Sequence, residues 1–329
     1  MEVSHCPVEN MDMNLSRKNI LVTGGTGFVG SHLVSALVEE GARVVSTYQS
    51  LDPRSYFSQQ ELSKHVAMEN VDLVNYEKVM DLVTKFEIEY IFHLGAQALV
   101  DVAYHNPRRT YESNIMGTVN LLEAARLYPG VKGIVVASSD KAYGKVGKNK
   151  YVESMALQGD HPYEASKSAT DLISQSYHKT YNVPVAITRF GNIYGEGDLN
   201  LSRIIPGAVH ALINKKTLEI RSDGKFVRDY IYVKDVVDGY ILLMNNIKKA
   251  RGEAYNFGSK ETLSVLELLE QMKLGLGEEV IYKILNQSKN EIPYQSLSYA
   301  KIKKQFGWEP KNSIATTIQT IKTWSESYK

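Results

Sequence analysis

The stretch that decides the fold is NILVTGGTGFVG, residues 19–30. A short apolar run leads into closely spaced glycines, of which Gly25, Gly27 and Gly30 have the spacing G-x-G-x-x-G. Gly24 gives a second, overlapping spacing, G-x-x-G-x-x-G, with the last two of them. Glycine lets the chain turn sharply after a strand and brings the start of the next helix close to a pyrophosphate. The pattern favours a dinucleotide site over a tight turn that binds nothing.

The residues that follow predict a βαβ unit. Val29, Leu33 and Leu37 recur at helical spacing, and Gly41 stands where this helix would end. A second apolar run, residues 43–48, comes directly afterwards. Strand, glycine-rich turn, helix and strand in this order predict a right-handed crossover between parallel strands.

The same alternation continues along the chain. Apolar runs at residues 90–94, 133–138 and 184–188 predict buried strands, and residues 118–127 predict an amphipathic helix. Unbroken apolar strands between such helices are typical of a parallel sheet covered on both faces. We therefore predict an α/β fold, a Rossmann-type doubly wound parallel sheet with a smaller C-terminal substrate-binding region.

The alternation loosens after Gly191, which suggests where the chain divides. We expect a flexible N-terminal extension at residues 1–17 and an NAD(P)-binding domain at 18–191. Residues 192–229 and 251–329 would form the substrate-binding region, and the apolar segment 230–250 would pack back on the first domain.

Composition excludes several classes of protein. The 329 residues include 38 Lys+Arg and 37 Asp+Glu, a net charge of +1, which offers no field for nucleic acid or an anionic membrane. Cys6 is the single cysteine, so we expect no metal site of the Cys/His type. No apolar run approaches the roughly 18 residues of a membrane span, and the N-terminus lacks a signal-peptide core. We expect a soluble cytoplasmic protein with a small-molecule substrate and no nucleic-acid or membrane partner.

The end of the second strand leaves the cofactor open between NAD and NADP. An acidic residue there usually holds the adenosine ribose, but residues 46–50 read STYQS. Asp52 comes late, and Arg54 lies close to it. Arg54 would suit the 2′-phosphate of NADP, or it is an ordinary solvated loop residue.

Tyr163 and Lys167 form a candidate reactive pair. Their i, i+4 spacing places them on one face of a helix, and Ser139 lies at the end of an apolar strand, where α/β sheets usually place chemistry. A tyrosine has a pKa of about 10, and a nearby ammonium together with an oxidised nicotinamide would favour its phenolate. The alternative is a surface Tyr–Lys pair that only supports the helix. Combined with the glycine turn, the pattern favours catalysis.

These residues carry a resemblance to a known family. The chain resembles the extended short-chain dehydrogenase/reductases of the nucleotide-sugar type over about residues 19–324. Within that family it is most similar to the sugar 4,6-dehydratases, and among these to the CDP-glucose 4,6-dehydratases. The matching stretches are residues 23–30, 72–73, 93–97, 114–118, 138–144, 189–200, 220–224 and 228–235, with the Tyr163/Lys167 pair.

The resemblance implies roles for residues at these positions. The implied cofactor-binding residues are Gly24, Thr26, Gly27, Phe28, Val29, Gly30, Asp72, Leu73, Leu94, Ala96, Gln97, Asn114, Tyr163 and Lys167. The implied substrate-binding residues are Asn192, Arg221 and Arg228, with Arg203 as a weaker candidate. Arginine suits a diphosphate because its planar fork donates two parallel hydrogen bonds.

The implied catalytic residues are Ser139, Asp140, Lys141, Tyr163 and Lys167. By analogy, Tyr163 takes the proton of the sugar C4 hydroxyl while NAD takes the C4 hydride. Lys141 then accepts the C5 proton, Asp140 protonates the departing C6 hydroxyl, and the hydride returns to C6. Alternatively, Lys141 is a solvated loop lysine.

Other outcomes on the same scaffold stay open. They are a nucleotide-sugar epimerase, a 5,6-dehydratase and a non-catalytic cofactor-sensing protein. Lys141 follows the CDP-glucose pattern, whereas Ser139 is closer to the epimerases, and Asp101 stands where the CDP-glucose branch has an arginine. The resemblance also implies a homodimer or homotetramer, paired through helical faces at residues 110–127 and 163–181.

Overall fold

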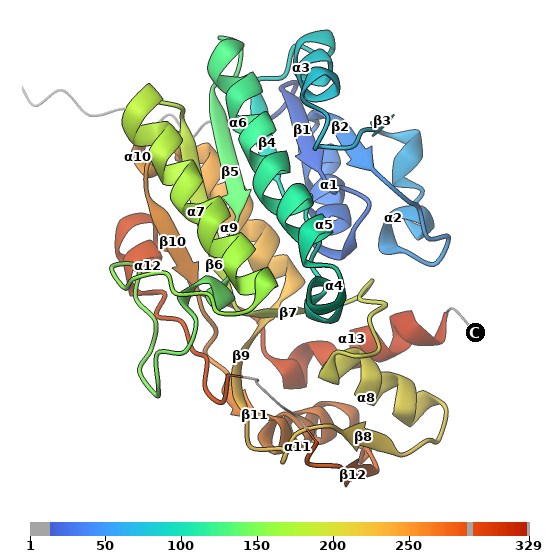
Figure 1. The fold of residues 1–329 in the computed structure, drawn as a ribbon. Helices are drawn as coiled ribbons and strands as arrows, with labels where there is room; N and C mark the ends of the chain where they lie inside the picture. The colour runs from blue at the N-terminus through green and yellow to red at the C-terminus, as the bar shows by residue number, and fades with distance from the viewer. Residues whose placement is uncertain (1–13, 288–291, 328–329) are drawn as a thin grey trace, which may run out of the picture.

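The computed structural model describes residues 14–287 and 292–327 (Figure 1). Most of the extension expected at residues 1–17 therefore lies outside the described residues. Its last part differs from the expectation, because the side chain of Leu15 is fully buried in a hydrophobic core. The Arg17 amide also donates to the Gly41 carbonyl at 2.8 Å, which ties this segment to the end of the first helix.

A seven-stranded parallel sheet forms the larger part of the molecule, and the predicted α/β, Rossmann-type fold class is confirmed. The spatial order is β10-β6-β5-β4-β1-β2-β3. The strands are β1 (Asn19–Thr23), β2 (Arg43–Tyr48), β3 (Ala67–Asn70), β4 (Tyr90–His93), β5 (Gly133–Ala137), β6 (Val185–Phe190) and β10 (Ala254–Phe257).

Helices cover both faces of this sheet. One face packs against α1 (Phe28–Glu39), α9 (Val233–Asn245), α10 (Ile247–Ala250) and α12 (Ala300–Phe306), beside the short α2 (Tyr56–Gln59). The other packs against α3 (Tyr76–Lys85), α6 (Gly117–Leu127) and α7 (Pro162–Tyr181), with α4 (Val100–His105) and α5 (Pro107–Tyr111) beside α7.

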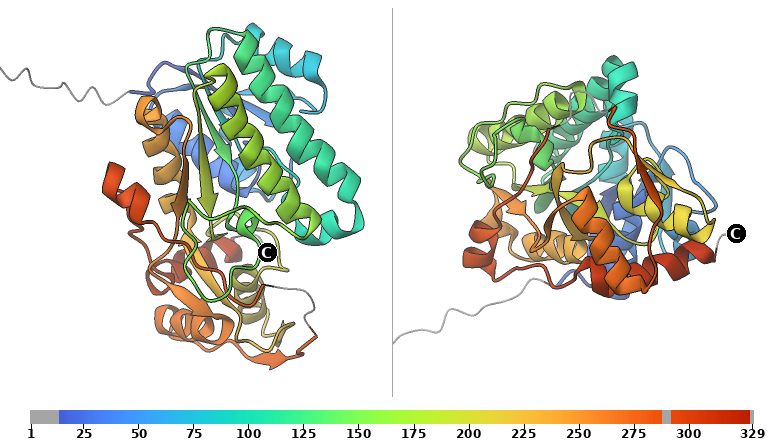
Figure 2. Two further views of the ribbon diagram at one scale, coloured as in Figure 1. Left: turned by 60° about the vertical axis from the view of Figure 1, so that its left-hand side comes forward. Right: turned by 90° about the horizontal axis from the view of Figure 1, so that it is seen from below.

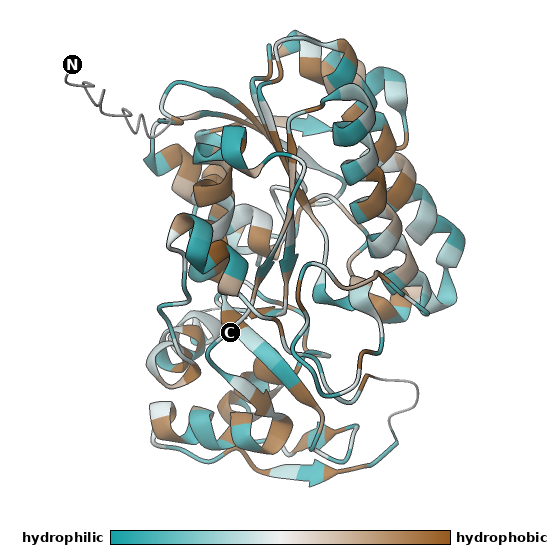
Figure 3. Ribbon diagram, turned by 90° about the vertical axis from the view of Figure 1, so that its left-hand side faces the viewer, coloured by the Kyte–Doolittle hydropathy of each residue, from teal (hydrophilic) through white to brown (hydrophobic). Residues whose placement is uncertain are grey.

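Alternation along each strand divides its side chains between two hydrophobic cores. On β1, Ile20 and Val22 belong to the core under α1 and α9, whereas Leu21 belongs to the core under α3 and α6. This is the period of two that a strand imposes on its side chains. Figure 3 shows the hydrophobic strands running between the two helical layers. In the described ranges, no helix combines the length and apolar character that a membrane crossing requires.

A smaller region lies at the carboxyl end of the sheet (Figures 1 and 2). It contains a three-stranded sheet and a parallel strand pair, packed with three helices around a separate core. Its elements are β7 (Asn192–Tyr194), α8 (Ile204–Ile213), β8 (Leu218–Ile220), β9 (Val227–Tyr232), β11 (Thr262–Ser264), α11 (Val265–Leu276), β12 (Tyr282–Ile284) and α13 (Ile314–Glu326).

The structure differs from the expected division of the chain at residues 251–329. Strand β10 pairs in parallel with β6 and completes the large sheet, and α12 packs against β10. Trp308 also belongs to the core under α1 and α9. The strand went unrecognised because four residues give too short an alternation to identify. The chain thus returns to the first domain twice, through α9 and through β10 with α12.

A buried ion pair joins α7 to β6. The Arg189 guanidinium donates to both oxygens of Asp171, at 2.8 and 2.9 Å, and the two side chains are 2% and 0% exposed. Arg189 also donates to the Tyr143 hydroxyl at 2.6 Å, and that hydroxyl donates to Asn256 on β10. The network fixes α7 against two strands and against the turn that follows β5.

We predict that Arg189→Met destabilises the protein by about 3–5 kcal/mol, because it leaves the Asp171 carboxylate buried without its cation. Urea unfolding followed by circular dichroism measures the loss. The double variant Arg189→Met/Asp171→Leu should recover much of it, since no unpaired charge remains. Lys64→Ala, which removes an exposed pair with Glu61, is the control and should change nothing measurable. Equal losses in Arg189→Met and the double variant would contradict the prediction.

Candidate active site

The glycine turn connects β1 to α1 and leaves the start of α1 free for an anion. Gly24 has φ +68°, and a Cβ atom on Gly30 would lie 2.2 Å from the Gly24 carbonyl oxygen, so both positions require glycine. Gly27 is the N-cap of α1, which has no side-chain cap and no acidic residue in its first turn. Uncapped N–H groups at a helix start suit a phosphate. The turn, with Thr26, Phe28 and Val29 at the same place, thus fits the pyrophosphate of a dinucleotide.

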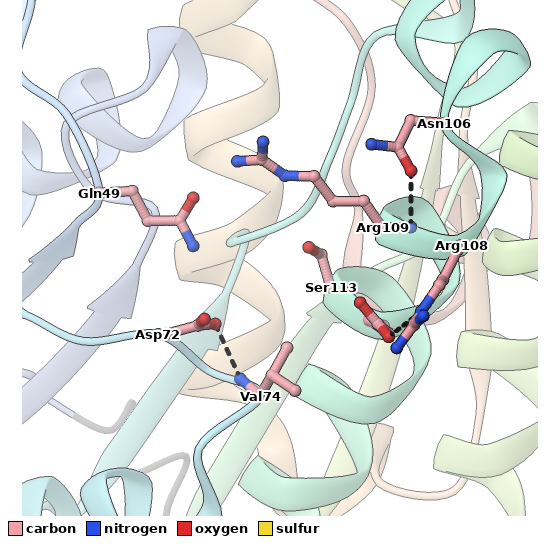
Figure 4. A pocket seen from close by; sticks show the side chains of 8 residues that line it. Gln49, Asp72, Val74, Asn106, Arg108, Arg109 and Ser113 are labelled. Atoms are coloured by element: carbon pink, nitrogen blue, oxygen red, sulfur yellow. Dashed lines mark hydrogen bonds and ion pairs between the residues drawn. The ribbon is translucent and has the colours of Figure 1, made fainter.

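A hollow of about 430 Å³ lies beside this turn, over the ends of β2 and β3 (Figure 4). Asp72 lines it and is held by the Val74 amide, which donates to its carboxylate at 3.1 Å. The buried Leu73 follows directly. The position is that of the adenosine half of a dinucleotide in a doubly wound fold. Arg54 is not among the residues that line the hollow, and its guanidinium is held by Asp52 at 2.9 Å.

The floor beneath the cofactor position is the end of β4, followed by Leu94, Ala96 and Gln97. His93 is buried between two threonine hydroxyls, Thr23 at 2.8 Å and Thr118 at 3.0 Å. Burial, with the positive charge of Lys167 nearby, lowers the pKa of His93 to about 3. His93 is therefore a neutral side chain that is hydrogen-bonded on both sides and packs beneath the cofactor position. Within the described ranges, no group of His, Cys, Asp or Glu side chains could hold a metal ion.

Asn114 lies in a π-helical turn, residues 112–116, and both ends of its amide are occupied. Its oxygen accepts from the Gln97 amide at 2.7 Å, and its nitrogen donates to the Gln97 carbonyl at 3.0 Å and to Ser166 at 2.9 Å. The sequence predicted that Asn114 binds the cofactor. In the structure its contacts join the loop after β4 to helix α7, and its role toward the cofactor stays a prediction.

Helix α7 begins immediately before Tyr163, and its first turn is closely defined. Pro162 occupies the first helical turn, and His161 with Glu164 forms a capping box at the helix start. Tyr163 and Lys167 then project from one face, as their spacing predicted. The Lys167 ammonium donates to the Ala137 carbonyl at 2.7 Å, at the end of β5.

Burial shifts the two groups in opposite senses. It raises the pKa of Tyr163 to about 12, reinforced by the negative charge of Asp140 and opposed by a hydrogen bond with Ser139 and by the charge of Arg203. It lowers the pKa of Lys167 to about 8, opposed by the charge of Asp171. Both shifts favour the uncharged forms in the free protein. A phenolate at this position therefore needs a further positive charge.

The tip of β5 brings three polar side chains together beside Tyr163. The Ser139 hydroxyl donates to the Asp140 carboxylate at 3.0 Å and accepts from the Lys141 amide at 3.2 Å. The Lys141 ammonium lies 3.3 Å from Asp140 and donates to Asn192 at 3.1 Å. Asp140 is nearly fully buried, whereas Lys141 is partly exposed. An acid and an amine thus face one another at the edge of the site.

The candidate substrate arginines all come from the smaller region. Arg203, the N-cap of α8, pairs with the buried Asp198 at 3.0 Å. Arg221 donates to the Ser202 carbonyl at 3.0 Å and lies 4.0 Å from the Asp101 carboxylate of the larger region. Arg228 on β9 donates to its neighbouring carbonyl at 2.8 Å. Burial raises the pKa of Tyr163, and the positive charge of Arg203 opposes this larger effect.

Two features of the site escaped the sequence analysis. Asp229 is buried and accepts from Thr262 and from the Leu297 amide, each at 2.6 Å. Burial, with the charge of Asp140, raises the pKa of Asp229 to about 6. Arg109 lines the hollow over β2 and β3. The contacts of Asp229 join segments far apart in the chain, and Arg109 lies far in sequence from the strand ends that it faces, so no local pattern marks either residue.

A doubly wound sheet with a glycine turn, and a Ser/Tyr/Lys set at the end of β5, define an extended short-chain dehydrogenase/reductase. The smaller region with its arginines corresponds to the nucleotide-sugar branch of that class. The sequence model of a protein family agrees with this: the family described as GDP-mannose 4,6 dehydratase matches residues 21–321. The chain belongs to this family.

The chain is similar to both dehydratases and epimerases. It is 29% identical to the CDP-glucose 4,6-dehydratase of Salmonella typhimurium over 94% of this chain and 91% of that protein. The dTDP-glucose 4,6-dehydratase of Bacillus anthracis, solved with NAD, is 28% identical with a TM-score of 0.82, over 95% of this chain and 97% of that one. The UDP-glucose 4-epimerase of Thermotoga maritima, solved with UDP-glucose, is 29% identical with a TM-score of 0.84, over 94% and 99%.

The lowered pKa of Lys167 predicts how stability depends on pH. Between pH 8 and about 10.4, the unfolded chain keeps a proton on this amine that the folded protein has released. The free energy of unfolding should therefore rise with pH across this window, by up to about 3 kcal/mol from this residue. Lys167→Met removes that contribution, so the difference in unfolding free energy between parent and variant should depend on pH. A constant difference from pH 8 to pH 10 would contradict the prediction.

Proposed function

We propose that the chain is an NAD(P)-dependent nucleotide-sugar 4,6-dehydratase, acting on CDP-glucose or a closely similar nucleotide sugar. The observation that carries the proposal is the acid–amine pair at the tip of β5, with Asp140 and Lys141 only 3.3 Å apart beside Tyr163. Oxidation at C4 needs Tyr163 and Lys167 alone. The removal of water also needs a base for C5 and an acid for the C6 hydroxyl, and this pair provides both. The similarity to a CDP-glucose 4,6-dehydratase supports the choice of nucleotide.

The dinucleotide would lie on the glycine turn with its adenosine over Asp72 and Leu73 and its nicotinamide beside Tyr163. When bound, it supplies a positive charge and a place where a hydride is held between its removal from C4 and its return to C6. Because the pKa of Tyr163 is about 12 in the free protein, its phenolate depends on that charge and on the Lys167 ammonium. Tyr163 then takes the C4 hydroxyl proton, with Ser139 holding the same oxygen.

The elimination step uses the proton that Asp140 and Lys141 share. Moving it from the ammonium to the carboxylate gives a neutral amine and a neutral acid, which lie 3.3 Å apart. The C4 ketone acidifies the C5 proton, which Lys141 accepts while Asp140 protonates the C6 hydroxyl and water leaves. Lys141 would then give this proton back to C5 when C6 is reduced, which restores its neutral amine.

Ser139 closes the proton cycle. After one turnover Tyr163 holds the proton of the C4 hydroxyl, and Asp140 has lost its proton to water. Ser139 donates to Asp140 at 3.0 Å and is hydrogen-bonded with Tyr163, so its hydroxyl links the two groups. Passing one proton along this link restores both residues without a proton from solvent.

The sugar nucleotide would lie between the β5 tip and the smaller region. Arg203, Arg221 and Arg228 would hold the diphosphate, and Asn192 the sugar next to Lys141. The outward faces of α6 and α7 favour a homodimer, because large apolar side chains are about half exposed there. They are Leu127, Leu172 and Tyr181.

The full-length protein incubated with NAD and CDP-glucose should release a product lighter by one water. Deuterium placed at C4 should appear at C6, because the same hydride leaves and returns. Mass spectrometry of products from a panel of CDP-, dTDP-, UDP- and GDP-sugars tests this. A product of unchanged mass with inverted C4 would identify an epimerase, and loss of water without deuterium at C6 would identify a different elimination.

Lys141→Ala should separate the two chemical steps. The variant keeps Tyr163 and Lys167 and should still oxidise C4, seen as the near-ultraviolet absorbance of reduced nicotinamide. Loss of water should slow by about 10²–10⁴-fold, because C5 lacks its base. Lys145→Ala, an exposed lysine in the same loop, should behave as the parent, and Tyr163→Phe should stop both steps. An unchanged elimination rate in Lys141→Ala would remove this residue from the mechanism.

A further inference from the structure

The hollow over the ends of β2 and β3 contains three polar side chains that point toward one another. Gln49 follows β2, and Arg109 and Ser113 come from α5 and the π-helical turn after it (Figure 4). Among the described residues, none of these three side chains has a hydrogen-bond or ion-pair partner. They converge where the adenosine ribose of a dinucleotide lies in a doubly wound fold.

Two arginines and two carboxylates line this hollow, and in the part of the chain that the structure describes the guanidinium of Arg109 forms no ion pair. Arg108 and Glu112 also line it, but they pair with one another at 2.7 Å. The Asp72 carboxylate is held by the Val74 amide on the adenine side. The guanidinium of Arg109 extends into the hollow from the opposite wall (Figure 4).

The end of β2 lacks the group that would exclude a phosphate. An acidic residue there accepts hydrogen bonds from the 2′-hydroxyl of NAD and repels the 2′-phosphate of NADP. Gln49 is uncharged and can donate to an anion through its amide. Arg54, which the sequence offered as a partner for the 2′-phosphate, is instead held by Asp52 outside the hollow. Its side chain is 67% exposed.

We propose that Arg109, with Gln49 and Ser113, receives a phosphate on the adenosine ribose, so that this chain accepts NADP at least as well as NAD. Arg109 is a specificity residue for the cofactor, and a guanidinium suits a phosphate because it donates two parallel hydrogen bonds. The inference rests on the dinucleotide site of the proposed function and does not depend on the sugar or on the elimination of water.

Calorimetric titration of the full-length protein with NAD and with NADP tests the proposal, because it measures binding rather than turnover. We expect the parent to bind NADP at least as tightly as NAD. Arg109→Ala should weaken the affinity for NADP by about tenfold or more and change the affinity for NAD by less than about twofold. Arg109→Lys, which keeps the positive charge, should lose less affinity for NADP than Arg109→Ala.

Arg54→Ala is the matched control, since it removes the same charge from the loop after β2 and should change neither affinity. Raising the salt concentration should weaken the affinity for NADP more than that for NAD in the parent, and both affinities equally in Arg109→Ala.

The proposal is overturned if the parent binds NADP more than tenfold weaker than NAD. It is also overturned if Arg109→Ala weakens both dinucleotides alike, or if Arg54→Ala reproduces its effect. If neither dinucleotide binds the parent, the proposed function fails as well, whereas normal NAD binding with an unaffected NADP affinity in Arg109→Ala overturns this inference alone.

Discussion

The buried Arg189–Asp171 pair is the contact on which the geometry of the site depends. Helix α7 carries Tyr163 and Lys167, and the tip of β5 carries Ser139, Asp140 and Lys141. The two come from separate parts of the chain, yet under the proposed function a proton passes between them over hydrogen-bond distances. Arg189 reaches α7 through Asp171 and the turn after β5 through the Tyr143 hydroxyl, so one guanidinium sets the spacing of both. A charge buried this deeply tolerates little displacement, since any gap leaves it unpaired.

Around that contact, the site combines groups whose surroundings favour neutral forms. Burial holds His93 as a neutral imidazole and works against both the Tyr163 phenolate and the Lys167 ammonium. Under the proposed function, such a site is inactive without a cofactor and becomes reactive when the positive charge of the bound nicotinamide enters. The energy that would ionise the phenol therefore comes from binding, which ties the chemistry to an occupied dinucleotide site.

Much of the fold follows from local sequence patterns. The strand and helix around the glycine turn lie where the apolar runs predicted, because the run of apolar residues in each is long enough to identify the element. β3 (AMEN) and β10 (AYNF) are four residues long and lie at the sheet edges, so neither has a distinct period. Leu15 is anchored by contacts with residues far along the chain, which a polar-looking N-terminus does not reveal. In the site, spacing on one helix predicted the Tyr163/Lys167 face. The contacts of Asn114 and Asp229, and the place of Arg109 in the hollow, depend on which distant loops meet, and local sequence pattern carries no information about that.

The pair between Arg221 and Asp101 joins the two regions of the molecule across the space where a sugar nucleotide would lie. Under the proposed function, a diphosphate must take Arg221 from Asp101, so entry of the ligand and release of this cross-region link are one exchange reaction. The displaced carboxylate stays within reach and competes for the guanidinium as soon as the product loosens. Both side chains are more than half exposed and the contact is 4.0 Å long, so the link is weak and its competition lowers affinity for the diphosphate only slightly.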